Sequence, residues 1–264
     1  MQQLELIGGG RMGEALLAGL LTDGWATAAD ITVVEPVEGR RAELADRYPG
    51  LAVAEAPAGA DGVIIAVKPG HVAEVARSLR VLGADAVGRV LSIAAGVTIT
   101  TIEAELGGSI PVVRAMPNTP ALVGAGASAI AAGTHAGPDD LAWAEGVLGA
   151  VGIVVRVAES QLDAVTGLSG SGPAYVFLVA EALIDAGVLV GLPRDVATDL
   201  AVQTLLGSAR LLAETDDDAA TLRAAVTSPG GTTAAGLRAL EDRATRAAFV
   251  AAVVAARDRS AELA

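Results

Sequence analysis

The sequence contains no cysteine, and only 2% of its residues are aromatic. The absence of cysteine excludes disulfides, thiolate metal sites and thiol nucleophiles, and it is compatible with a reducing compartment. The scarcity of aromatic residues means that alanine, valine and leucine must build the core of a chain that is 52% hydrophobic. With 264 residues, the chain is long enough for one large domain or two modest ones.

Positive charge is also scarce. The chain has 18 basic and 31 acidic residues, which gives a formal net charge of −13. A charge of this sign disfavours a polyanionic partner. The sequence also lacks a basic stripe interleaved with aromatic residues, so we expect no nucleic-acid partner.

No apolar run has the uninterrupted length of a membrane span. The longest uncharged stretch, residues 115–137, is broken by Pro117, Pro120 and several glycines, and the apolar segment after Tyr175 contains Glu181 and Asp185. The first expected strand begins within a few residues of the start, which leaves no room for a signal peptide. We therefore expect a cytoplasmic protein without a membrane partner.

Three glycines near the start have the G-x-G-x-x-G spacing. Gly8, Gly10 and Gly13 follow an apolar run and precede a helical pattern. In a dinucleotide site, the first glycine permits a sharp turn, the second lets the backbone approach a pyrophosphate, and the third lets helix and strand pack closely. Glu35, at the end of the next apolar run, supplies the acidic residue expected about 20 residues further on. The context predicts a dinucleotide site, and a structural turn without a ligand is the alternative.

Strand and helix patterns alternate in the first part of the chain. Strands are expected at residues 4–7, 31–34, 63–67, 90–93, 111–115 and 126–130. Helices are expected at residues 12–23, from residue 39, and at 72–82. This alternation predicts a parallel sheet covered on both faces.

Strand signals end near residue 157. Residues 161–190 indicate a helix interrupted at 170–173, residues 193–214 indicate another, and two more end near residue 263. The predicted fold is therefore an α/β Rossmann-type N-terminal domain (1–157) followed by an all-helical C-terminal domain (158–264). The second domain is rich in apolar residues, so we expect it to be a dimerisation domain.

Further candidate residues follow the expected strands, where ligands bind in α/β sheets. Lys68 could contact a cofactor phosphate, ribose or amide, or it could be a solvated surface lysine. The small residues at 94–96 would let a nicotinamide ring approach the backbone. Arg114 and Asn118 either bind a ligand or brace a proline-bounded loop.

Two segments of the helical half combine glycine with a helix start. Residues 170–173 and 228–233 each place backbone N–H groups where a carboxylate could bind, although both could be ordinary caps and turns. The sequence shows neither a Ser/His/Asp arrangement nor a two-histidine metal pattern, and we expect no metal.

Taken together, these motifs resemble those of the pyrroline-5-carboxylate reductase family over nearly the whole length. The resemblance rests on residues 8–13, 66–69, 114–118, 163–175, 185–187, 191–193 and 228–233. It implies a Rossmann domain and a helical domain that exchanges contacts with a second subunit, in dimers that commonly assemble into decamers. It also implies reduction of the C=N bond of pyrroline-5-carboxylate to L-proline by NAD(P)H.

The resemblance also implies roles for individual residues. Thr233 matches the threonine beside the pyrroline nitrogen, and we treat it as the catalytic candidate. The expected substrate-binding residues are Glu159, Ser228, Gly231, Thr232 and Thr233. The expected cofactor-binding residues, from the motifs and the resemblance together, are Gly8, Gly10, Arg11, Met12, Gly13, Glu35, Val67, Lys68, Pro69, Ala94, Ala95 and Gly96.

Two departures from the family leave the choice of cofactor open. Glu35 stands where members often carry serine or threonine, and Val53 stands where some carry asparagine. Glu35 can bind both ribose hydroxyls and would repel a 2′-phosphate. Arg40 and Arg41 could attract that phosphate, or they could form a solvated helix face. We predict that NADH is used at least as well as NADPH.

Two other functions are compatible with a dinucleotide site. A hydroxyacid dehydrogenase of similar architecture would use a lysine and an asparagine in its helical domain, and the helical half of this chain has no lysine. A non-catalytic dinucleotide sensor would not need the loops that contain Ser171 and Thr233. Both functions are therefore less favoured than the reductase.

Overall fold

The structure is a computed structural model that describes residues 4–263. By compactness, these residues divide into two units. The first runs as far as Ser171 and also takes in the chain from Ala255 onwards, and the second is Gly172–Val254. The domain boundary at 157/158 stays a prediction, and each unit is described below by itself.

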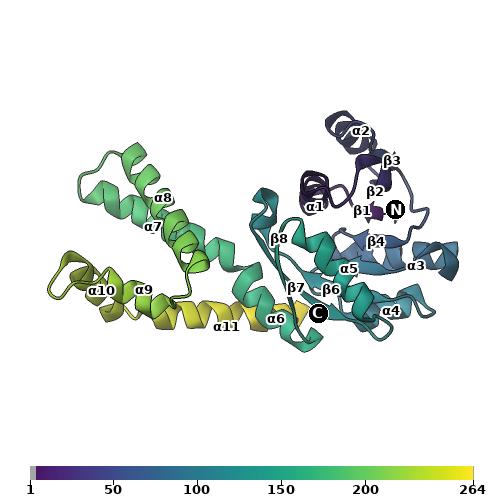
Figure 1. Ribbon diagram of the computed structural model, residues 1–264. Coiled ribbons are helices and arrows are strands. Elements are labelled where there is room, and N and C mark those ends of the chain that lie inside the picture. Colours follow the sequence, from purple (N-terminus) through teal and green to yellow (C-terminus); the bar gives the residue numbers. More distant parts are fainter. Residues whose placement is uncertain (1–3, 264) are drawn as a thin grey trace. The chain divides into compact units, whose positions relative to one another are not determined.

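The first unit is built on one mixed sheet (Figure 1). Within residues 4–263 the strand order is β3-β2-β1-β4-β5-β6-β7-β8. The strands are β1 (Leu4–Ile7), β2 (Ile31–Val34), β3 (Ala52–Ala54), β4 (Gly62–Ile65), β5 (Val90–Ser92), β6 (Val112–Met116), β7 (Gly126–Ala132) and β8 (Gly152–Arg156). Strand β1 lies between β2 and β4 and is parallel to both. The sheet therefore changes its direction of winding at β1, which is where ligands bind in open α/β sheets.

Both faces of the sheet are buried, because successive residues of β4 enter different cores. Ile64 belongs to one buried cluster, and its neighbours Val63 and Ile65 belong to the other. Helices α1 (Arg11–Asp23), α2 (Glu38–Arg47) and α5 (Pro138–Gly149) supply the first cluster, and α3 (Val72–Leu82), α4 (Ile99–Leu106) and α6 (Leu162–Val165) supply the second. The predicted α/β architecture is confirmed.

One strand pair differs from the all-parallel expectation. Strands β6 and β7 are antiparallel, with Ala115 opposite Ile130. Residues 117–125 connect them through the short turn η4 (Thr119–Val123). A parallel crossover needs about a dozen residues or more, so this connection is too short for one. Strands β3 and β8 lie at the two edges of the sheet and were not among the six strands expected.

The rest of the chain is helical, as predicted. After α6, a π-helical turn, η6 (Thr166–Gly170), leads into the second unit. The helices that follow are α7 (Gly172–Leu189), α8 (Arg194–Glu214), α9 (Ala219–Ala225), α10 (Thr232–Asp242) and α11 (Thr245–Leu263). The remaining short helical turns are η1 (Ala28–Asp30), η2 (Pro69–His71), η3 (Ala84–Ala86) and η5 (Glu159–Gln161).

The second unit buries little of its apolar surface. Its buried hydrophobic residues are Ala197 and Ala201, whereas Phe177 and Leu178 are 63% and 65% exposed. By length and composition, the helical stretch Glu159–Leu189 could cross a membrane, which differs from the expectation from sequence. A helix that packs against a protein partner can have the same composition. We therefore expect the exposed apolar side chains of this stretch to be buried by another molecule.

Candidate active site

The turn after β1 requires glycine at two positions. Gly8 has φ +112°, and a Cβ there would lie 2.6 Å from the carbonyl oxygen of Ala66, which follows β4. A Cβ on Gly13 would collide with the carbonyl oxygen of Gly8. The two glycines therefore let β1, α1 and the end of β4 approach one another closely.

The second glycine of the motif faces open space. Gly10 is exposed and is the N-cap of α1, and a Cβ there would meet nothing within 4 Å among the residues that the structure describes. No side chain of residues 4–263 caps the helix, so the first turn, which includes Arg11 and Met12, has backbone N–H groups available to an anion. These features fit the pyrophosphate of a dinucleotide.

The end of β4 lies beside this turn. Val67 is partly buried, and Lys68 and Pro69 are exposed at the start of η2. Lys68 is the only lysine of the sequence. Within residues 4–263 its amine makes no hydrogen bond or ion pair, so it is available to a ligand at this edge of the sheet.

The loop after β5 is formed by small residues, as expected. Ala94 is buried and its N–H donates to Ser92 Oγ at 3.4 Å, whereas Ala95 is exposed. Gly96 has φ +74°, and a Cβ there would lie 3.4 Å from the carbonyl oxygen of Leu263, at the end of α11. No pattern in the sequence indicates that the end of α11 lies beside this loop.

Arg114 and Asn118 serve as internal braces. Arg114, 7% exposed, donates from Nη1 to Glu159 Oε1 at 2.9 Å, and the same oxygen accepts the N–H of Ile99 at 2.7 Å. Asn118 donates to the carbonyl oxygen of Ser169 at 3.0 Å and accepts the N–H of Ala127 at 2.8 Å. Of the two interpretations, bracing is therefore the one that the structure shows. Glu159 ties β6 to α4, and its predicted contact with substrate stays a prediction.

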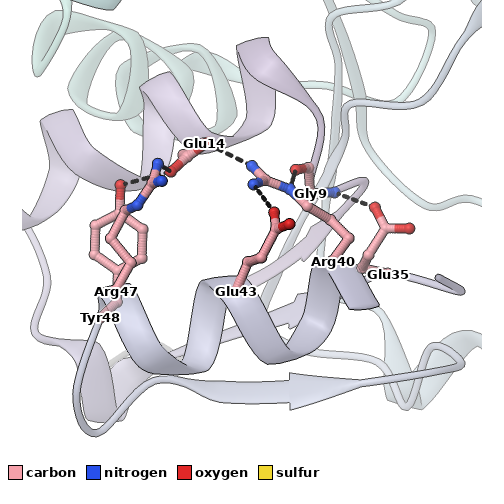
Figure 2. Close-up of polar contacts among 7 residues, drawn as sticks. All are labelled: Gly9, Glu14, Glu35, Arg40, Glu43, Arg47 and Tyr48. Atoms are coloured by element: carbon pink, nitrogen blue, oxygen red, sulfur yellow. Dashed lines mark hydrogen bonds and ion pairs between the residues drawn. The ribbon is translucent and has the colours of Figure 1, made fainter. Parts of the chain in front are cut away.

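Glu35 and Arg40 hold the middle residue of the glycine turn from two sides (Figure 2). The carboxylate of Glu35 accepts the N–H of Gly9 at 3.1 Å and the N–H of Val37 at 3.0 Å. Arg40 donates from Nε to the carbonyl oxygen of Gly9 at 2.8 Å. The end of β2 and the start of α2 are thereby fixed against the turn.

Neither arginine after Glu35 forms a solvated helix face. The side chains of Arg40 and Arg41 are 24% and 19% exposed. Arg41 donates from Nη1 to the carbonyl oxygens of Glu35 at 2.7 Å and Pro36 at 2.8 Å. The solvated interpretation is wrong because both side chains fold back onto the chain, which helical spacing alone does not reveal.

Glu14, on the first turn of α1, connects α1 to α2. Its carboxylate accepts hydrogen bonds from Arg40, from Arg47 at 2.5 Å and from the Tyr48 hydroxyl at 3.2 Å (Figure 2). Burial favours a higher pKa for Glu14, but the hydrogen bonds from Arg40 and Arg47 outweigh it, and the net pKa is lowered. Burial and the Glu14 carboxylate raise the pKa of Tyr48. Sequence reasoning missed this cluster.

In the second unit, the loop at residues 228–233 leaves a helix start open. Gly231 is the N-cap of α10, its N–H donates to the carbonyl oxygen of Ser228 at 3.0 Å, and no side chain caps the helix. Ser228, Thr232 and Thr233 are exposed. The loop therefore combines three exposed hydroxyls with the uncapped first turn of a helix, which suits a carboxylate.

The segment at residues 170–173 does not offer a second open helix start. The N–H of Ser171 donates to the carbonyl oxygen of Thr166 at 2.8 Å, and the chain continues through η6 into α7. The π-helical turn therefore uses a donor that was expected to be free. The interpretation of this segment as a carboxylate receptor is wrong.

Comparisons with known proteins match both parts of the chain. Residues 159–263 match the family described as pyrroline-5-carboxylate reductase dimerisation, and residues 3–96 match the family described as NADP oxidoreductase, coenzyme F420-dependent. A pyrroline-5-carboxylate reductase of Mycobacterium tuberculosis is 47% identical over 287 aligned residues, which cover 100% of this chain and 97% of the relative.

Solved structures give the same result. A pyrroline-5-carboxylate reductase from Coxiella burnetii has a TM-score of 0.94 and 37% identity, covering 100% of this chain and 98% of that one. The pyrroline carboxylate reductase of Plasmodium falciparum, crystallised with NADP bound, has a TM-score of 0.86 and 29% identity, covering 99% of this chain and 98% of that one.

Proposed function

This chain belongs to the pyrroline-5-carboxylate reductase family, and we propose that it reduces 1-pyrroline-5-carboxylate to L-proline with NADH or NADPH, the final step of proline biosynthesis. The observation that carries the proposal is the open glycine turn at Gly10, within a chain that matches reductases of this family over its full length. A turn that only joined a strand to a helix would not need an exposed, uncapped helix start.

We assign the dinucleotide to the edge of the sheet that the glycine turn forms. The first turn of α1 would hold the pyrophosphate, Glu35 would face the adenosine ribose, and Lys68 would supply a positive charge. The small residues at 94–96 would border the nicotinamide. When bound, the cofactor supplies the hydride for the reaction.

We assign the substrate carboxylate to the loop at residues 228–233. The N–H groups at the start of α10 and the hydroxyls of Ser228 and Thr232 would hold the carboxylate, while the Thr233 hydroxyl would orient the ring nitrogen. An imine accepts hydride best when its nitrogen is protonated. The chain therefore needs to stabilise an iminium rather than supply a strong acid, which agrees with the absence of an obvious general acid from the sequence.

We also propose that the active protein is at least a dimer, and that it works in the cytoplasm. The dimerisation family match and the exposed apolar side chains of the second unit support self-association. The decamer implied by the resemblance is a larger assembly of the same kind. A cysteine-free sequence is compatible with a reducing compartment.

A turnover assay tests the proposal. Purified protein should oxidise NADH or NADPH only when pyrroline-5-carboxylate is present, and proline should accumulate at the same rate. The dinucleotides without substrate, and with a 2-oxo acid in its place, serve as controls. Folded protein that turns over neither cofactor would refute the proposal, and turnover of the oxo acid instead would identify a hydroxyacid dehydrogenase.

A further inference from the structure

We infer that Glu14 and Glu43 set the preference for the unphosphorylated dinucleotide, because they hold the Arg40 guanidinium against the glycine turn and keep its charge from a 2′-phosphate. This inference rests on the proposed function, since it requires a dinucleotide at the glycine turn. It deepens that proposal by naming the residues that select between NADH and NADPH.

The guanidinium of Arg40 is held by three separate groups. Nε donates to the carbonyl oxygen of Gly9 at 2.8 Å, Nη1 donates to Glu43 Oε2 at 2.9 Å, and Nη2 donates to Glu14. Arginine binds phosphate best through a pair of parallel N–H bonds from one edge of its planar fork. In this protein, each terminal nitrogen of that fork already donates one N–H to a carboxylate, so a phosphate would have to compete with Glu14 and Glu43.

The position of Arg40 makes this occupancy relevant to the cofactor. Glu35 accepts the N–H of Gly9, and Arg40 donates to the carbonyl oxygen of the same residue. In dinucleotide-binding folds, the acidic residue at the end of the second strand binds the ribose 2′-hydroxyl. A phosphate on that hydroxyl would therefore lie near Glu35. It would also lie near Arg40, because Glu35 and Arg40 both contact Gly9.

The local charges oppose a phosphate while the cluster is intact. Figure 2 shows three carboxylates, Glu14, Glu35 and Glu43, beside two guanidinium groups, Arg40 and Arg47. The Glu14 side chain is 17% exposed and stays ionised near neutral pH, because its arginine partners lower its pKa. These five side chains together have one more negative than positive charge, so by themselves they give a 2′-phosphate no net attraction.

Arg41 provides a distinct comparison on the same helix. Its Nη1 is held by the carbonyl oxygens of Glu35 and Pro36, and its carboxylate neighbour Glu55 is 3.8 Å away and 77% exposed. Arg41 is therefore held by neutral groups and only loosely paired with an acid. If Arg41 determined the preference, removing Glu14 and Glu43 would change little.

The experiment measures the dissociation constants of NADH and NADPH by fluorescence titration of the full-length protein. The variants are Glu14→Gln, Glu43→Gln, the two combined, and the two combined with Arg40→Gln. The ratio of Kd for NADPH to Kd for NADH should fall about tenfold in the double variant, since a freed guanidinium gains a charge-assisted contact. It should rise again when Arg40→Gln is added. Glu105→Gln, which removes another paired carboxylate of the first unit, is the matched control.

The outcomes separate this inference from the proposed function. Wild-type protein that binds neither dinucleotide would overturn both. An unchanged ratio in a double variant that still binds NADH would overturn the inference alone. A ratio that stays low after Arg40→Gln is added would show that lost repulsion, and not Arg40, causes the change, which also overturns it. Because the Glu43 side chain is 64% exposed, Glu43→Gln alone should fold and shift the ratio in the same direction even if Glu14→Gln is unstable.

Discussion

In the first unit, Leu16, Ile64 and Leu91 are fully enclosed by the sheet and its helices, whereas in the second unit Phe177 and Leu178 are about two-thirds exposed. Both units consist largely of alanine, valine and leucine. The difference therefore lies in architecture rather than composition. A sheet with helices on two faces encloses small side chains within one chain, but the helices of the second unit leave many of theirs uncovered.

The two units therefore achieve stability in different ways. The first has a self-contained core on which a cofactor site can be held rigidly. The second has an apolar surface that needs a second chain, which agrees with the dimerisation family that matches residues 159–263. Apolar helices awaiting such a partner also explain why Glu159–Leu189 has the composition of a membrane span.

The largest expected effect comes from placing charge on the apolar surface of the second unit. The double variant Phe177→Asp, Leu178→Asp should dissociate the assembly at micromolar concentration, because charged side chains cannot be buried there without partners. Sedimentation velocity measures the change. Val81→Asp, at an 86% exposed position of the first unit, should leave the mass unchanged. A wild-type protein that sediments as a monomer would contradict the claim that the apolar surface of the second unit needs a second chain.

The next effect concerns the enclosed core of the first unit. Leu91→Ala should lower the free energy of unfolding by about 2–5 kcal/mol, because it leaves a cavity at a fully buried position. The same change at Leu122, 54% exposed in the same unit, should cost about 1 kcal/mol or less. Urea unfolding at matched protein concentration compares the two. Equal costs would contradict the contrast in burial.

In the second unit, Thr233→Ala tests the proposed substrate loop. A lost hydrogen bond to a charged group costs about 1.5–3 kcal/mol, so kcat/KM for pyrroline-5-carboxylate should fall roughly ten- to a hundredfold. Ser228→Ala should act in the same direction. The Kd of the cofactor should change little in either variant. Thr198→Ala, which removes an exposed hydroxyl bonded to its own helix, is the control. Unaltered kinetics in Thr233→Ala would remove this residue from the mechanism.

In the first unit, Glu35→Ser tests the cofactor preference without touching the substrate loop. The ratio of kcat/KM for NADPH to kcat/KM for NADH should rise about tenfold, since the change removes a carboxylate that would repel a 2′-phosphate. The KM for pyrroline-5-carboxylate should stay close to the wild-type value. A wild type that already favours NADPH by about tenfold or more would show that an arginine outweighs Glu35.

The smallest effect is the pH dependence that Glu14 gives the first unit. Its pKa is lower in the folded than in the unfolded chain, so its contribution to stability is full above the unfolded pKa. That contribution is lost as the pH falls through the folded pKa. Glu14→Gln should therefore lose less stability than the wild type between about pH 6 and pH 3. Urea unfolding midpoints of the wild type and Glu14→Gln, measured across this pH range, test the prediction. The same decrease in midpoint with falling pH in both proteins would contradict it.

The sequence was most informative where local signals and burial coincide. The glycine turn, Glu35 and the buried strands β1, β4 and β5 were predicted because each leaves a periodic or spacing signal. Edge strands β3 and β8 were missed because they are short or exposed on one side and resemble loops. The antiparallel pairing of β6 and β7 follows from the length of their connection. The spacing of the two expected strands already contained this signal, but the prediction of a parallel sheet did not use it.

Long-range polar contacts could not be predicted from one sequence. The contact of Arg40 with Gly9 spans 31 residues, and that of Arg47 with Glu14 spans 33. No periodicity links such pairs, so the sequence left two interpretations of Arg40, a phosphate ligand or part of a solvated helix face, and it made no prediction for Arg47. Similarly, the start of α7 looked open because Pro173 is typical of a first helical turn, but the preceding π-helical turn continues the hydrogen bonding.

The most direct test of the account is an isotope experiment on the proposed reaction. NADH carrying deuterium at both C4 positions of the nicotinamide is incubated with pyrroline-5-carboxylate and the purified protein, and the proline is analysed by mass spectrometry. The account predicts proline with one deuterium, at the carbon that formed the C=N bond, in amounts equal to the NADH consumed. Unlabelled proline, or consumption of NADH without proline, would contradict it.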